Sequence, residues 1–221
     1  MNPEDLVLEA ADHYYRGEFE LAIEALDKAI ELRPGFAEAW YNKGITFSVM
    51  GRVEEEILAY DNALRINPRY AEAWNNKASA LGKAGRYEES LEAAGKALGL
   101  DPGFSVAWCN KGAALSALGR DLEAIEAYDR AIAIQGNYIE AWYNKAVSLH
   151  NLDKIKGALK AYDRALELSP DYPDALFNRA GIHARTGELE KAASDLKRAL
   201  ELEPSLGEKA LADEELKALL P

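Results

Sequence analysis

The sequence predicts an all-α protein, a solenoid of helix-turn-helix repeats, on three observations. Tryptophan recurs every 34 residues, at Trp40, Trp74, Trp108 and Trp142, and each opens a similar stretch of sequence. Self-similarity at a fixed period of this length is typical of a solenoid, in which each unit buries its apolar face against its neighbours. No run of residues alternates apolar and polar side chains as a half-buried strand does, and residues that favour helices are frequent.

The tryptophan register divides the chain into six units within a single solenoid domain of residues 1–221. We place the units at residues 3–36, 37–70, 71–104, 105–138, 139–172 and 173–206. In a unit such as 71–104, apolar and small residues recur mostly three or four positions apart in two blocks, which predicts two amphipathic helices. Five units carry a glycine between the blocks, where a helix C-terminus favours a residue that tolerates positive φ. These glycines are Gly17, Gly51, Gly85, Gly119 and Gly187.

Proline closes the second helix of five units, because it lacks an amide hydrogen and clashes with the preceding helical turn. The prolines are Pro34, Pro68, Pro102, Pro170 and Pro204. The fourth unit lacks its proline, and the fifth has Asp153 in place of the turn glycine. Gly95 and Gly99 fall inside the second helix of the third unit, each at a cost of about 1 kcal/mol relative to alanine. We therefore expect softer joints between residues 94 and 154.

The two ends of the chain carry helix signals of their own. Asn2, Pro3 and Asp5 provide an N-cap residue, a proline at the first helical position and an acidic first turn. After the sixth unit, residues 207–220 predict one capping helix that covers the last repeat. Its apolar face would consist of Leu211, Leu216, Leu219 and Leu220.

Two central units carry a set of residues that matches a known family. The second unit has Trp40, Gly44, Phe47, Tyr60, Ala63 and Pro68, and the fourth has Trp108, Gly112, Leu115, Ala124, Tyr128 and Ala131. This pattern resembles the tetratricopeptide repeat (TPR), whose signature places Trp, Leu-Gly, Tyr, Ala, Phe and Pro at these intervals. The resemblance covers residues 3–206. It implies a right-handed α-solenoid whose first helices line a concave face.

The resemblance also implies a function, a non-catalytic scaffold that binds an extended peptide or partner segment in its concave groove. An asparagine follows each tryptophan by two positions, and the row continues into the last unit. The row is Asn42, Asn76, Asn110, Asn144 and Asn178. It resembles the asparagine ladder with which superhelical members of the family clamp peptide backbones, since each amide offers donors and acceptors. The alternative is that these side chains bridge one helix to the next or record recent duplication.

Specificity in such a groove would come from positions that vary between repeats. The candidates are Tyr41, Asn75, Tyr143 and Phe177 immediately before the asparagines, and Lys83, His150 and Arg185 further along the same helices. Cys109 occupies the equivalent place in the fourth unit. Aromatic residues such as Tyr41 and Tyr143 provide interface anchors. Packing against a neighbouring helix is an equally open interpretation of the same residues.

Two rows of charge accompany the asparagines. The acidic row is Glu38, Glu72, Glu140 and Asp174. It favours a basic or neutral peptide over an acidic one, or it stabilises its own helices through the helix dipole. The basic row is Lys43, Lys77, Lys111, Lys145 and Arg179, and Asp61, Asp129 and Asp163 recur in three of the same units. We expect an ion-pair ladder between helices, and the rival is that the cations bind ligand carboxylates.

Glu56 stands where the repeat has a small residue at the helix crossing, facing Gly44. One interpretation is a buried functional carboxylate. The other is a side chain whose stem fits past the glycine so that its charge reaches water.

Composition and missing motifs exclude several classes of function. A net charge of −12 argues against nucleic-acid binding, which needs a basic surface. No stretch approaches the roughly 20 apolar residues that span a bilayer, and no signal peptide is present, so we expect a cytoplasmic protein. A lone Cys109, only three histidines and no metal-binding pattern predict no enzyme, no metal and no cofactor. The alternative function is a structural module, a homo-oligomer that self-associates through its solenoid ends or groove.

Overall fold

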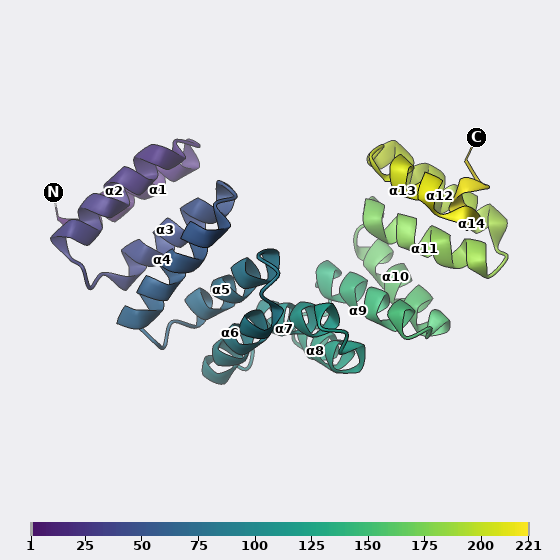
Figure 1. The fold of residues 1–221 in the computed structure, drawn as a ribbon, viewed down its shortest axis with the longest axis horizontal. Helices are drawn as coiled ribbons and strands as arrows, with labels where there is room; N and C mark the ends of the chain where they lie inside the picture. Colours follow the sequence, from purple (N-terminus) through teal and green to yellow (C-terminus); the bar gives the residue numbers. More distant parts are fainter. Residues whose placement is uncertain (1, 221) are drawn as a thin grey trace. The chain divides into compact units, whose positions relative to one another are not determined.

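The computed structural model describes residues 2–220, and over this range its regular structure is entirely helical. The helices are α1 (Pro3–Tyr15), α2 (Phe19–Leu32), α3 (Ala37–Val49), α4 (Val53–Ile66), α5 (Ala71–Lys83), α6 (Tyr87–Leu100), α7 (Ser105–Ala117), α8 (Asp121–Ile134), α9 (Ile139–Asn151), α10 (Ile155–Leu168), α11 (Pro173–Arg185), α12 (Leu189–Leu202), α13 (Leu206–Ala212) and α14 (Glu214–Lys217). Each predicted repeat contains two consecutive helices joined by a short turn (Figure 1). The all-α helix-turn-helix prediction is confirmed.

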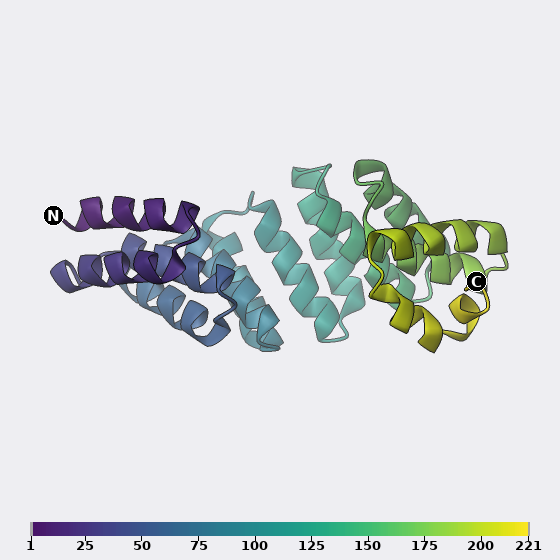
Figure 2. The same ribbon diagram turned by 90° about the horizontal axis from the view of Figure 1, so that it is seen from above.

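The helices gather into two compact units, residues 1–119 and residues 120–221. The first unit contains α1 to α7 and the second contains α8 to α14. In each unit the two helices of a repeat pack side by side, and each second helix packs against the first helix of the next repeat (Figure 2). The boundary lies within the range, residues 94–154, where the sequence predicts softer joints. The single domain predicted for residues 1–221 stays a prediction.

The turns inside the repeats have the backbone conformation that the glycines predict. Five turn glycines have φ between 70° and 80°: Gly17, Gly51, Gly85, Gly119 and Gly187. Among residues 2–220, the non-glycine residue with positive φ is Asp153, at 54°, in the fifth repeat. Aspartate tolerates this region better than most residues but still bears a steric cost there.

Replacing Asp153 with glycine is expected to stabilise the protein by about 0.5–1 kcal/mol, because it relieves this steric cost. The Asp153–Arg185 contact that is lost, 3.6 Å long between two exposed groups, is worth little. Thermal unfolding should show an increase of about 1–4 °C for a protein of this size. Asp153→Ala is the matched control and should unfold at a lower temperature than the wild type. A glycine variant less stable than the alanine variant would contradict this interpretation.

The spacing of the tryptophans has a structural cause in the links between repeats. The indole N–H of Trp74 donates to the carbonyl oxygen of Pro68 at 2.9 Å, and that of Trp108 donates to Pro102 at 3.0 Å. In the repeat that lacks the proline, Trp142 donates to the carbonyl of Gly136 at 3.0 Å. Each of these tryptophans therefore ties the start of its repeat to the preceding link, and this tie does not require proline.

The basic row forms an ion-pair ladder, as we expected from the sequence. Lys43, Lys77 and Lys145 each lie 2.5 Å from an aspartate sixteen residues earlier, on the second helix of the preceding repeat. These aspartates are Asp27, Asp61 and Asp129, and Arg179 contacts Asp163 in the same way at 2.7 Å. The lysine side chains are only 15–19% exposed, so their stems cover apolar surface.

Lys111 interrupts the ladder. Gly95 stands where the other repeats of the row have aspartate, and the Lys111 ammonium lies 5.0 Å from the centre of the Trp108 ring. The structure supports the packing interpretation of the basic row, because the paired cations contact carboxylates of the neighbouring repeat.

The N-terminal helix signal is confirmed as a capping box. The Asn2 side-chain oxygen accepts from the Asp5 amide at 2.7 Å, and the Asp5 carboxylate accepts from the Asn2 amide at 3.2 Å. Two amides that have no partner inside the helix are thus satisfied. Helix α1 begins at the proline that the sequence places in its first turn.

The single capping helix predicted at residues 207–220 is wrong, because the structure has two short helices there. The chain turns at Asp213, whose carboxylate accepts from the Leu216 amide at 2.9 Å and so caps α14. An aspartate that bonds its own downstream backbone competes with continuation of the helix. As a result Leu216 is buried while Leu211 is 58% exposed, so the predicted leucine face does not form. The capping role is kept, since α14 packs against α11.

Candidate functional site

The first unit presents a surface formed by the first helices of its repeats, α1, α3, α5 and α7, which we call the first-helix face. Two adjoining pockets open on it and share Ile45. The N-terminal pocket, about 160 Å³, is lined by Val7, Tyr14 and Asn42 among others. The second pocket, about 170 Å³, contains Asn76, Glu56 and Lys83, and we call it the Glu56 pocket. Side chains from five helices, α1 to α5, thus line these two neighbouring pockets of the first unit.

Three asparagines of the first unit, Asn75, Asn76 and Asn110, are linked with Tyr41 into one chain of hydrogen bonds, while Asn42 lines the N-terminal pocket. Asn76 donates to the Tyr41 hydroxyl at 3.2 Å, and its own side-chain oxygen accepts from Asn75 at 3.1 Å. Asn110 in turn donates to the side-chain oxygen of Asn75 at 2.9 Å. The bonds run from α3 through α5 to α7, so the bridging interpretation describes part of what these residues do. They also hold the half-buried amides of Asn76 and Asn110 in fixed orientations.

Asn75, which we expected to contact a ligand as a specificity residue, is not exposed at the surface. It is only 5% exposed, and both ends of its amide are used inside the chain of hydrogen bonds. The structure places Asn75 inside the chain of hydrogen bonds, where it bonds Asn76 and Asn110, and its contact with a ligand stays a prediction. Asn75 occurs in one repeat alone, and variation of this kind between repeats does not reveal that a side chain is buried.

The tyrosines before the asparagines are half-buried and stack on other tyrosines. The Tyr41 ring centre lies 4.7 Å from that of Tyr70 and 5.9 Å from that of Tyr60. Burial raises the pKa of Tyr41, and the charge of Glu72 raises it further. Burial also raises the pKa of Tyr70 to about 12. Tyr70, which sequence reasoning missed, is the last residue of its repeat and gives this face a second aromatic surface.

The second unit repeats the tyrosine–asparagine arrangement between α9 and α11. Asn178 donates to the Tyr143 hydroxyl at 3.1 Å, and the Tyr143 ring centre lies 4.9 Å from that of Tyr172. Asn144 is half-buried on α9. Phe177 packs against buried clusters of the same unit, which makes it a core residue with a partly exposed edge. Both units therefore fix an asparagine amide against a half-buried tyrosine.

His150 and Arg185, two further candidates, contact each other in the second unit. His150 Nε2 lies 2.8 Å from Arg185 Nη1. A guanidinium only donates, so Nε2 accepts and the hydrogen of the neutral ring belongs on Nδ1. Burial lowers the pKa of His150, and the positive charge of Arg185 lowers it further. Burial and the contact with Arg185 thus both favour the neutral ring.

A titration of His150 is expected to give a pKa below the ordinary 6.5. The pKa of His150 is lower in the folded protein than in the unfolded chain. The contribution of this group to stability is therefore present at pH values above the unfolded-state pKa, and it is lost as the pH falls through the folded-state pKa. Ring resonances followed by NMR against pH measure the value. In Arg185→Met the pKa should move upward, since one of the groups that lowers it is removed. A wild-type pKa at or above 6.5 is incompatible with this geometry.

Glu56 is buried, so the expectation that its charge reaches water is wrong. Its exposed fraction is 2%, and its carboxylate lies 3.5 Å from the Lys83 ammonium, which also donates to the Ser48 hydroxyl at 3.0 Å. The nearest neighbour of Gly44 at this crossing is Tyr60. A Cβ atom on Gly44 would lie 2.5 Å from a ring carbon of Tyr60, so the glycine makes room for that tyrosine.

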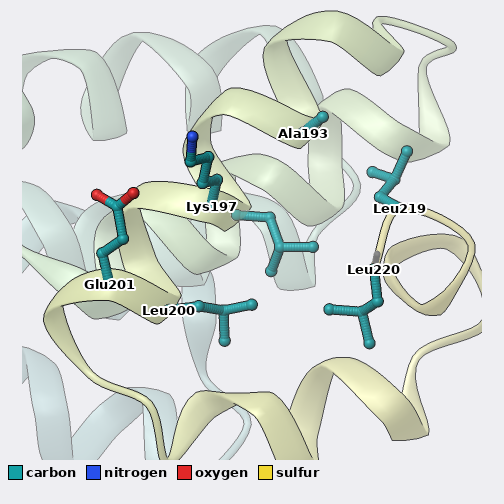
Figure 3. Close-up of a pocket in the computed structure, with 7 residues that line it drawn as sticks. Ala193, Lys197, Leu200, Glu201, Leu219 and Leu220 are labelled. Atoms are coloured by element: carbon teal, nitrogen blue, oxygen red, sulfur yellow. The ribbon is translucent and has the colours of Figure 1, made fainter.

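A third pocket lies at the C-terminal end of the second unit and is mostly apolar. Leu219 and Leu220, on the segment after α14, lie across it from Ala193, Lys197 and Leu200 of α12 (Figure 3). Its volume is about 590 Å³. Exposed apolar surface of this kind marks contact sites in many proteins, which makes this pocket a candidate for association through an end of the repeat array.

Cys109 is buried, with 5% of its surface exposed. Within residues 2–220, no group of three or more His, Cys, Asp or Glu side chains is placed to hold a metal ion. Over the same range, no helix has the length and apolar character needed to cross a membrane.

The sequence matches family models described as tetratricopeptide repeat over most of its length. One covers residues 7–71 and 143–206, a second covers 71–104, and a third covers 105–138. The uncharacterized protein MJ0572 of Methanocaldococcus jannaschii is 40% identical over 56 residues, a match that covers 22% of this chain and 65% of that protein. The chain thus spans 65% of the length of that relative.

Solved structures with the same fold include PilF of Pseudomonas aeruginosa, with a TM-score of 0.79 at 22% identity over 91% of this chain and 92% of that one. They also include YrrB, a TPR protein with an unusual peptide-binding site, with a TM-score of 0.64 at 25% identity over 82% of this chain and 94% of that one. The helix pairs, the turn glycines and the matched repeats agree with one another. The chain belongs to the tetratricopeptide-repeat family.

Proposed function

We propose that this protein is a non-catalytic scaffold that binds an extended segment of a partner protein on its first-helix face. Tetratricopeptide-repeat proteins are typically protein-interaction scaffolds, and the finer proposal concerns where and how this chain binds. The observation that carries it is the chain of hydrogen bonds from Tyr41 through Asn76 and Asn75 to Asn110, beside two adjoining pockets. The similarity to YrrB adds support.

Fixed asparagine amides suit the recognition of a peptide backbone. An asparagine side chain offers two donors and a two-lone-pair acceptor, and the bonds between helices use only part of this capacity. Asn76 and Asn110 remain half-buried and so keep surface toward a ligand. Packed helices lie roughly 8–10 Å apart and an extended chain advances about 3.3 Å per residue, so neighbouring asparagines meet a bound backbone about every third residue. Affinity would then depend little on the side chains of the bound segment.

The charge around the tyrosines favours a partner segment that is basic or neutral. Glu38 and Glu72 lie close enough to Tyr70 to raise its pKa through their negative charge. The whole chain has a net charge of −12, which also favours a basic or neutral partner. The same negative charge disfavours binding of nucleic acid. Charge complementarity steers binding and suppresses wrong partners. The cytoplasm, which the sequence predicts as the compartment, is kept as part of this proposal.

Selection from a random peptide library tests the proposal without knowledge of the natural partner. The wild type is compared with Asn76→Ala/Asn110→Ala, and circular dichroism confirms that both are folded. Asp61→Ala/Asp129→Ala is the control, because it removes two aspartates that pair with lysines of the ion-pair ladder and leaves the asparagines intact. We expect peptides that bind the wild type and the control but not the asparagine variant. Equal recovery on all three proteins, or no recovery on any, would rule the proposed site out.

Self-association is the second candidate function, and the C-terminal pocket favours it. Leu219 and Leu220 line this pocket, while Leu8 and Tyr15 on α1 are 69% and 85% exposed. Light scattering of the purified protein distinguishes the two functions. A dimer or larger assembly that Leu219→Ser/Leu220→Ser converts to monomer supports self-association, and a wild-type monomer excludes it at the concentration measured.

A further inference from the structure

Glu56 is large and charged at a position where every other repeat has a small residue. The equivalent position at the crossing of the two helices is held by Ala22, Ser90, Ala124, Ala158 and Ala192, each at most 2% exposed. Only the second repeat has a charged residue there. Five repeats show that a small side chain suffices for packing at this crossing, so the carboxylate is not needed to build the fold.

This buried carboxylate contacts the ammonium group of Lys83 at the long end of the hydrogen-bond range. Transfer of a charge from water into a protein is costly unless the charge is paired and hydrogen-bonded. Lys83 approaches Glu56 only to 3.5 Å, and its side chain is 47% exposed. The same ammonium group donates to Ser48 at 3.0 Å. A carboxylate accepts several hydrogen bonds, so Glu56 keeps capacity for a better-placed donor.

The Glu56 pocket has the size and lining to admit that donor. Its volume of about 170 Å³ equals the volume of about five or six water molecules in the liquid. Ile45, Val49 and Tyr60 supply apolar contact, while Ser79 and Asn76 add polar groups. A small pocket that combines apolar side chains with a carboxylate suits a lysine side chain, which has a four-carbon stem and a compact ammonium group with three donors. The planar guanidinium of arginine is broader.

We propose that the Glu56 pocket binds a lysine side chain of the partner segment. The ammonium group of that lysine pairs with Glu56 and displaces Lys83, whose exposed side chain can turn toward solvent. This inference rests on the proposed function, because Asn76 belongs both to the pocket and to the chain of asparagines that would hold the backbone. A lysine site would make one position of the bound segment selective, on a face that otherwise tolerates many sequences.

The test compares lysine preference among peptides selected from the same random library. Glu56→Ala should fold, because four other repeats have alanine at this position and a fifth has serine. Glu54→Ala is the matched control. It removes the same charge from the same helix, but at a side chain that is 76% exposed. We expect a lysine at a constant position in the peptides selected by the wild type and by the control, and no such lysine with Glu56→Ala.

Binding constants for one selected lysine peptide sharpen the result. Loss of one partner from a buried charge pair should weaken binding by about 30-fold or more in Glu56→Ala. Changing the peptide lysine to alanine should weaken binding to the wild type by a similar factor, and it should have little further effect on Glu56→Ala. Lys83→Met removes the competing cation and should bind the lysine peptide more tightly than the wild type does.

The outcomes separate the two proposals. Peptides that depend on Asn76 and Asn110 but show no lysine preference, or keep it in Glu56→Ala, would overturn the lysine site and leave the peptide-binding face in place. A set of selected peptides that does not depend on the asparagines would overturn both. Weaker binding by Lys83→Met would show that Lys83 is a ligand contact and would also overturn the inference.

Discussion

Replacing Arg179 with methionine is expected to destabilise the protein by about 2–3 kcal/mol. Arg179 donates to both carboxylate oxygens of Asp195, at 2.7 and 2.8 Å, and to Asp163 at 2.7 Å. The Asp195 side chain is only 11% exposed and the Arg179 side chain 21%, so water screens this pair weakly. These bonds raise the pKa of Arg179. Without the guanidinium, the nearly buried carboxylate of Asp195 loses its main hydrogen-bonding partner.

Denaturant unfolding of Arg179→Met measures the loss, and two further variants test its cause. Lys145→Met is the matched control, because Lys145 occupies the same position in the preceding repeat but pairs only with Asp129, a side chain that is 53% exposed. It should cost less than about 1 kcal/mol. Asp195→Asn in the Arg179→Met background should recover part of the stability. Equal costs for Arg179→Met and Lys145→Met would contradict the importance assigned to the buried aspartate.

Replacing Gly44 with alanine is expected to cost about 1–3 kcal/mol, even though alanine favours helices more than glycine does. The new Cβ atom would lie 2.5, 2.7 and 2.9 Å from three ring carbons of Tyr60. Tyr60 is 1% exposed, and its ring is packed against Tyr41, so it has little room to move. The strain would therefore be taken up by the crossing of α3 and α4.

Gly181→Ala is the control for this prediction. Gly181 also lies in a first helix, and a Cβ atom there would meet no heavy atom within 4 Å. This variant should be more stable than the wild type by up to about 1 kcal/mol, because only helix propensity changes. Urea unfolding of both variants shows whether the two substitutions act with opposite sign. A stabilising Gly44→Ala would mean that the Tyr60 ring moves aside freely.

Features that repeat along the chain were predictable from the sequence. Because each repeat has the same neighbours, one pattern of apolar spacing, turn glycine and closing proline determines the helix pair wherever it recurs. The ion-pair ladder was predictable in outline, since lysine and aspartate recur at fixed places. Asp27 is a further member that sequence reasoning missed; it pairs with Lys43 of the next repeat. Asn2 was recognised as a cap because its signal is local.

Features that occur once were harder to predict. Asp213 breaks the capping segment by bonding its own backbone, and an amphipathic pattern of leucines gives no sign of such a local competitor. Asn75 and Glu56 are both buried, although asparagine and glutamate usually lie at the surface. Their burial depends on side chains from the adjacent repeat, which sequence spacing does not reveal. For the candidate site, the sequence indicated the row of asparagines, and the structure supplied the bonds that orient them.

The side-chain amide resonances of Asn76 and Asn110 provide the most direct test of the central claim, that the first-helix face binds an extended segment. The isotopically labelled protein would be titrated with a peptide selected by the wild type, and the amide signals followed by NMR. We predict saturable chemical-shift changes of both asparagine side-chain amides. The backbone amide signals of Lys145 and Leu219 should not change. Shifts confined to Leu219 and its neighbours, with both asparagine amides unmoved, would contradict the account and place the interaction at the C-terminal pocket.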